Sequence, residues 1–249
     1  MNASSTQPFV SANRAARWSQ RLLWATLIIA AVAATSDAFE FSLLSRTGAG
    51  VVSEAEATAN DLRQGAIALL QLLIFIASAA AFLTWSYRVH KNLPALGARN
   101  LKYSPGWAVG GFFVPFLNCA RPFQVMEEAW RRSYFLAHES DPTPQTHPQH
   151  PEPPTFALVQ WWWGLLLLSA AFGRLGARIV AGDPTLEQLK AGSVVSVISD
   201  LLDIPAAWLA IRIIGYITRW QDERASRIQI LPMAPPPPIP PPPKSLHVN

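Results

Sequence analysis

The chain has 249 residues, of which 50% are hydrophobic and only 14% are charged, and it carries a formal net charge of +4. Soluble globular domains contain about 25% charged residues, so this composition excludes an ordinary water-soluble fold and indicates a lipid environment. The basic residues form no dense run of the kind that nucleic acid attracts, so we expect anionic membrane lipids, and no nucleic acid, among their partners.

The first long apolar window covers residues 22–44 and follows an N-terminal segment, 1–21, that contains three arginines. A helix needs about 20 mostly apolar residues to cross the ~30 Å hydrocarbon layer, and this window is long enough although it contains Asp37 and Glu40. A cleaved secretory signal is the alternative, because the first apolar run ends in the small-residue pattern 31–33. The long N-terminal segment and the return of apolar residues after Asp37 favour a retained helix.

Three further windows predict spans. Residues 65–87 contain no charge at all, and residues 155–173 are equally uncharged and include three consecutive tryptophans. Residues 191–214 are long enough despite two aspartates and one arginine. We therefore expect an all-α fold, a four-helix transmembrane bundle within a membrane domain at 22–231, followed by a proline-rich cytoplasmic tail at 232–249.

A shorter apolar stretch, 106–120, decides the orientation, because counting it as a fifth span would invert everything after it. If it does not span, 15 Lys and Arg residues lie on the side of the N-terminus and 5 on the other; if it spans, each side holds 10. Basic residues concentrate in cytoplasmic segments, so four spans with both termini in the cytoplasm are predicted. Pro115 interrupts the stretch, which suits a re-entrant or interfacial segment within an element at 105–135.

Residues 123–135 read as an amphipathic cytoplasmic helix, because apolar residues recur there at spacings of three and four. We expect this helix to lie on the inner leaflet with its charged face in water; docking of a partner is the alternative. A proline-rich linker, 139–154, follows, and its histidines have no carboxylate or thiolate neighbours, so no metal site is expected. The apolar positions of the helix are Phe123, Met126, Trp130 and Tyr134.

The most specific pattern lies between Trp85 and Ser133. Its candidate interfacial motif consists of Trp85, Arg88, Asn92, Pro105, Gly106, Trp107, Pro115, Asn118 and Pro122. It resembles the bacterial membrane family catalogued as domain of unknown function 4328, and the tryptophan-rich third span also looks like that family's. The resemblance implies a four-helix protein of the bacterial inner membrane and supplies no activity.

Asp200 and Asp203 in the fourth span are the main candidates for a polar site, because a charged side chain at the bilayer centre costs at least ~2.5 kcal/mol. They continue a stripe of serines and alanines at helical spacing, which should face the bundle interior. Pro205 removes an amide donor and frees a carbonyl close to both acids. The alternative to a functional site is that the acids hold the bundle together by bonding to Gln71 in the second span or Gln160 in the third.

These features predict a scaffold or regulatory interaction protein that acts at the cytoplasmic face. A small proton- or ion-coupled carrier that uses the intramembrane carboxylates is the alternative. The sequence at 127–132 matches the Glu-Glu-xxx-Arg element of intramembrane proteases, but the third and fourth spans contain no histidine to complete a metal site. We therefore expect no enzyme, no cofactor and no metal.

Overall fold

The computed structural model describes residues 8–47, 50, 52–138 and 156–230. The linker expected at 139–154 and the tail expected at 232–249 lie entirely outside these residues. The described part of the chain is all-helical and contains no strand. Its long helices are α1 (Asn13–Thr47), α2 (Glu54–Asn92), α4 (Arg121–His138), α5 (Ala157–Ile179) and α6 (Leu186–Ile230), and its short ones are η1 (Pro94–Leu96), α3 (Trp107–Gly110) and η2 (Leu117–Cys119).

Three helices, α1, α2 and α6, are long and apolar enough to cross a membrane. The remaining predicted span, the third one at 155–173, corresponds to α5, which is long enough but does not join this group. Its three tryptophans, Gln160 and Arg174 reduce its mean hydropathy, because none of these side chains is strongly apolar.

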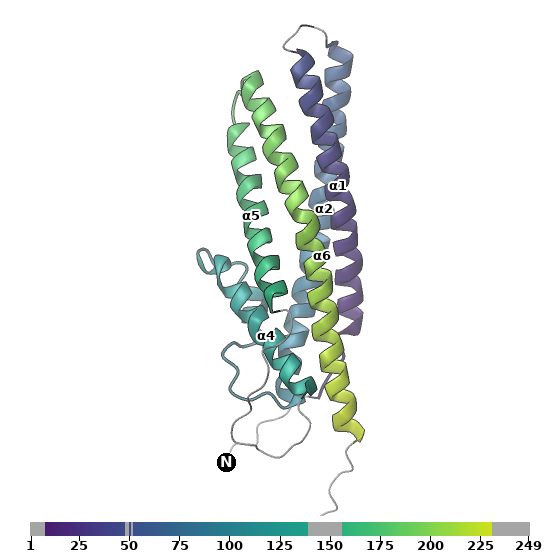
Figure 1. Ribbon diagram of the computed structural model, residues 1–249, viewed down its shortest axis with the longest axis vertical. Coiled ribbons are helices and arrows are strands. Elements are labelled where there is room, and N and C mark those ends of the chain that lie inside the picture. The colour runs from purple at the N-terminus through teal and green to yellow at the C-terminus, as the bar shows by residue number, and fades with distance from the viewer. Residues whose placement is uncertain (1–7, 48–49, 51, 139–155, 231–249) are drawn as a thin grey trace, which may run out of the picture.

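Four of these long helices, α1, α2, α5 and α6, form a bundle in which they run side by side along the long axis of the molecule (Figure 1). Helix α6 packs most extensively against α1 on one side and α5 on the other, while α2 packs against α1 and touches α6 only slightly. At one end of the bundle α4 packs against α6, and we call this the α4 end. At the other end, the hairpin end, α1 leads into α2 and α5 leads into α6 (Figure 1).

Two capping boxes start the helices that begin at the hairpin end. The Ser53 hydroxyl accepts a hydrogen bond from the Glu56 amide at 3.3 Å, and the Glu56 carboxylate accepts one from the Ser53 amide at 3.0 Å. Thr185 and Gln188 repeat this exchange before α6, at 3.3 and 2.8 Å. Each box satisfies two of the amides that a helix start leaves without intrahelical partners, so both helix starts are fixed locally by sequence.

The core is densest at the α4 end, where aromatic side chains of four helices meet. Trp130 of α4 is fully buried, and its ring centroid lies 4.7 Å from that of Trp220 on α6. Met126 and Tyr134 are buried on the same face of α4. This face was expected to lie on the inner leaflet, and that expectation is wrong: α6 continues to Ile230, far beyond the predicted end of its span at residue 214, and so offers α4 a protein surface.

Candidate functional site

A polar cavity of about 300 Å³ lies in the half of the bundle next to the hairpin end. All four long helices of the bundle contribute to its wall. We call it the acidic cavity, because three of its lining residues are carboxylates. Its charged and amide groups are Asp37, Glu40, Gln64, Gln71 and Asp200.

Asp37 and Glu40 enter the cavity from α1, and their spacing of three places them on one helix face. The Gln64 side-chain amide donates to both of them, to Asp37 Oδ1 at 3.0 Å and to Glu40 Oε2 at 2.9 Å. Glu40 Oε2 also accepts from the Ser193 hydroxyl of α6 at 3.0 Å. Three helices thus share one hydrogen-bond network around two acids.

The two aspartates of α6 lie deeper in the bundle. Asp200 is 8% exposed and accepts a hydrogen bond from Gln71 Nε2 at 3.0 Å, so the structure brings together this pair of sequence-predicted site residues. Asp203 accepts from the Ser169 hydroxyl of α5 at 2.6 Å. Pro205 lies two residues further along α6, which continues through it as one helix.

Gln160 does not belong to this site, and its assignment there is wrong. It is exposed in the first turn of α5, while the residue of α5 that reaches Asp203 is Ser169. Nine residues separate the two along the helix, which is about 13 Å. The presence of a polar residue in a span does not show at which depth in the bundle it lies, and Gln160 lies at a different depth from Asp203.

The four carboxylates have few positive neighbours. In the described part of the chain, none of them lies within 4.0 Å of a Lys, Arg or His nitrogen. The nearest basic residue in the network is Arg63, whose guanidinium donates to Ser36 Oγ at 2.9 Å and to Asn60 Oδ1 at 2.6 Å. Over the same described residues, no group of three or more His, Cys, Asp or Glu side chains is arranged to hold a metal ion.

The sequence contained a signal for the α1 side of this cavity. Asp37 and Glu40 were noted only as weaknesses of the first span, although two acids three residues apart in an apolar window must share a face. Gln64 and Gln71 are seven residues apart on α2, which also places them on one face. The pairing of the two faces depends on how α1 and α2 pack, which no single segment specifies.

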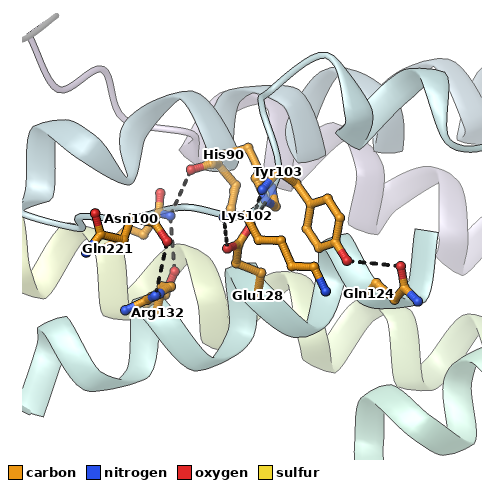
Figure 2. A network of polar contacts seen from close by, with 10 residues as sticks. His90, Asn100, Lys102, Tyr103, Gln124, Glu128, Arg132 and Gln221 are labelled. Atoms are coloured by element: carbon orange, nitrogen blue, oxygen red, sulfur yellow. Dashed lines mark hydrogen bonds and ion pairs between the residues drawn. The ribbon is translucent and has the colours of Figure 1, made fainter. Parts of the chain in front are cut away.

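A polar network surrounds Glu128 of α4 at the α4 end of the bundle, away from the acidic cavity (Figure 2). The Glu128 carboxylate accepts hydrogen bonds from the backbone amides of Lys102 at 2.6 Å and Tyr103 at 3.1 Å. It also lies 3.7 Å from Nε2 of His90, which is fully buried. Burial alone would raise the pKa of Glu128, but His90 and the two amides outweigh it and hold that pKa below its usual value.

Two motif residues of α2 tie it to α6. Trp85 is fully buried, and its indole donates to the Thr218 hydroxyl at 3.0 Å. Asn92 donates to the Val10 carbonyl at 2.9 Å and to Gln221 Oε1 at 3.3 Å. Since Gln221 in turn donates to the backbone of α2 and to α4, this buried network fixes how three helices meet.

The remaining motif residues shape the segment between α2 and α4. Trp107 begins α3, and the Arg121 guanidinium lies 5.1 Å from its ring and 5.1 Å from that of Tyr103. Pro115 lies in an apolar tip, residues 113–117, where Phe116 is 92% exposed. Of the others, Pro122 is buried, Arg88, Pro105 and Asn118 are half-buried, and Gly106 is exposed.

An all-helical chain with three helices apolar enough to span a membrane, and with carboxylates inside those helices, has the features of a helical membrane protein. The chain belongs to the family described as a domain of unknown function (DUF4328), whose family model matches residues 49–219, so the resemblance seen in the sequence is confirmed. Comparison with curated proteins and with solved structures finds no match. The matched range begins after α1, so it includes Gln71 and Asp200 but neither Asp37 nor Glu40.

Proposed function

We propose that the chain is a bacterial inner-membrane protein with four spans, namely α1, α2, α5 and α6. The α4 end faces the cytoplasm, and both termini lie on that side. The 15-to-5 division of Lys and Arg supports this orientation, and the packing of α5 along α6 supports its insertion beside that helix.

Within this placement, we propose that the acidic cavity takes up a proton from the outer side and that the chain is a non-enzymatic, proton-coupled carrier. The observation that carries the proposal is the presence, inside apolar helices and next to a cavity of about 300 Å³, of four carboxylates that form no ion pair with any basic residue in the described part of the chain. Buried charges of one sign are costly, so uptake of positive charge stabilises such a group of acids.

The geometry favours a proton over a metal cation. A metal ion needs several oxygen ligands around one point, and the described carboxylates form no such group. Protons need only hydroxyl, amide and carboxyl groups within hydrogen-bond reach. Within this range Gln64 contacts two of the acids, and Gln71, Ser169 and Ser193 contact one each.

Flux measurements in reconstituted vesicles test this function. An imposed pH gradient should drive proton flux through the wild type, and Asp37→Asn or Asp200→Asn should abolish it. The matched control is Asp61→Asn, which removes an exposed acid of α2 outside the cavity and should leave the flux unchanged. Equal flux in the wild type and in Asp200→Asn, with both proteins folded, would sink the carrier proposal.

A scaffold role at the cytoplasmic face is the second proposal, supported by the apolar tip at 113–117. Phe113 is 70% exposed and Phe116 92% exposed there, while the apolar face of α4 is occupied by the chain itself. The tip, not α4, is therefore the surface available to a partner. Crosslinking in cells compares the wild type with Phe113→Ser plus Phe116→Ser; an unchanged set of crosslinked proteins contradicts this role.

A further inference from the structure

A second cavity, of about 380 Å³, lies between α1 and α6 near the α4 end. We call it the α1–α6 groove. It is separate from the acidic cavity, with which it shares no lining residue. Its floor contains two residues with little or no side chain, Ala16 and Gly215, so the two helices leave space between their polar side chains.

The groove is lined by two arginines, Arg17 and Arg219, and by two acids, Asp222 and Glu223. Arg17 lines it, is exposed, and forms no ion pair within the described residues. Arg219 lines the opposite wall and bonds Glu223 through Nε at 2.7 Å, which leaves its other guanidinium nitrogens available. The remaining acid, Asp222, already accepts from Asn13 Nδ2 at 2.6 Å. Two arginines on facing walls can hold the oxygens of a phosphate.

The depth of the groove matches the headgroup region of a bilayer. The apolar window of α1 starts at residue 22, directly after Arg21, and on α6 the corresponding window ends at residue 214, just before Gly215. Trp18 and Trp24 flank this level on α1, and both are about half exposed. Tryptophan prefers the membrane–water interface, so Arg17 and Arg219 lie where lipid phosphates lie.

An apolar stripe continues from the groove into the hydrocarbon region. Trp24 and Ile28 follow Arg17 at seven and eleven residues, which places them on the same face of α1, and both are exposed. On α6, Trp208 precedes Gly215 by seven residues and is exposed on the corresponding face. A molecule in the groove therefore meets arginines at one end and an apolar surface at the other.

We propose that the α1–α6 groove binds an anionic glycerophospholipid of the adjacent leaflet, with its phosphate between Arg17 and Arg219 and an acyl chain along Trp24 and Ile28. The basic residues of the sequence predict a general preference for anionic lipids, and the proposal assigns this preference to one defined site. It rests on the chain lying in a membrane and is independent of the carrier role.

Native mass spectrometry of the purified full-length protein in neutral detergent tests this site with phosphatidylglycerol and phosphatidylcholine as probes. We expect selective retention of phosphatidylglycerol. Arg17→Gln plus Arg219→Gln should weaken its binding about 25-fold, which corresponds to about 1 kcal/mol for each arginine. The matched control is Arg174→Gln plus Arg178→Gln, which removes two exposed arginines of α5 and should leave binding unchanged.

Several outcomes overturn the proposal. Equal retention of the two lipids, or undiminished phosphatidylglycerol binding in the double glutamine variant, rules out the site. An equal loss of phosphatidylglycerol binding in the α5 control variant shows that the lipid is attracted by the net charge of the protein alone. Displacement of the lipid by excess inorganic phosphate assigns the groove to a soluble anion instead. If the double glutamine variant does not fold, Arg17→Gln alone tests the site, because Arg17 is exposed and forms no ion pair in the described structure. The lysine variant Arg17→Lys plus Arg219→Lys keeps both positive charges and should bind phosphatidylglycerol.

Discussion

The two ends of the bundle bury polar groups in opposite ways. At the α4 end, Asn92 and Gln221 are almost fully buried, and hydrogen bonds pair them with each other and with backbone or side-chain groups. Towards the hairpin end, the acids Asp37, Glu40 and Asp200 line a cavity and have no basic partner among the described residues. The hydrogen bonds of Asn92 and Gln221 specify one packing, whereas acids without an ion-pair partner beside open space are suited to exchange.

The sharpest test of the packed end is Trp130→Ala. Trp130 is fully buried against Trp220, so its truncation should cost about 3–5 kcal/mol of unfolding free energy. Thermal or denaturant unfolding in detergent measures this loss. The control is Trp161→Ala on α5, because that side chain is 68% exposed and its loss should have a small effect. Similar costs at both positions would mean that α4 does not pack on α6 as described.

A smaller loss is expected when the polar network of the same end is broken. Gln221→Leu removes the hydrogen bonds that Gln221 donates to the Val89 carbonyl and the Ser133 hydroxyl, and the one that it accepts from Asn92, which should cost about 2–3 kcal/mol. Unfolding curves of this variant and of Gln229→Leu, which alters an exposed residue of the same helix, measure the difference. If the two variants unfold alike, the network does not stabilise the junction of the helices.

A substitution in the acidic cavity should affect function strongly and stability little. Asp200→Asn keeps an oxygen that can accept from Gln71 and removes a buried charge, so the unfolding free energy should change by less than about 1 kcal/mol or rise. Proton flux should nevertheless disappear. A stability loss as large as that of Gln221→Leu would class Asp200 with the structural network.

The smallest effect concerns pH at the α4 end. The pKa of Glu128 is lowered in the folded protein from its usual 4.5, so the stability that this group provides is fully present above that pH and is lost as the pH falls through the lowered pKa. Unfolding measured from neutral pH to below pH 4.5 should therefore show a decline that Glu128→Gln reduces by up to about 1 kcal/mol. Glu187→Gln, which alters an exposed acid of α6, should keep the full decline.

Sequence patterns predicted those features that depend on one helix at a time. The apolar windows located the long helices, and spacings of three and four placed Asp200 on an inward face with Gln71 opposite. Helix ends were less accurate, because α6 extends beyond its apolar window into an amphipathic segment whose apolar side chains, such as Ile217 and Trp220, pack in the core.

The errors concern contacts between helices. Gln160 was assigned to the polar site by its presence in a span, but its depth along α5 separates it from Asp203. The apolar face of α4 was assigned to lipid, because an amphipathic pattern does not reveal whether lipid or protein covers it. Asp37 and Glu40 were missed as site residues for a similar reason: only the packing of α1 against α2 and α6 brings them to Gln64 and Ser193.

The central claim, that the acidic cavity exchanges protons while the α4 end does not, can be tested through the reactivity of the carboxyl groups. Dicyclohexylcarbodiimide, an apolar reagent that modifies protonated carboxyl groups in membranes, should label Asp37 or Asp200 in the full-length protein, and labelling should fall as the pH rises. Peptide mass spectrometry locates the label. Labelling confined to Glu128, or labelling of the cavity acids that does not change with pH, would contradict the account.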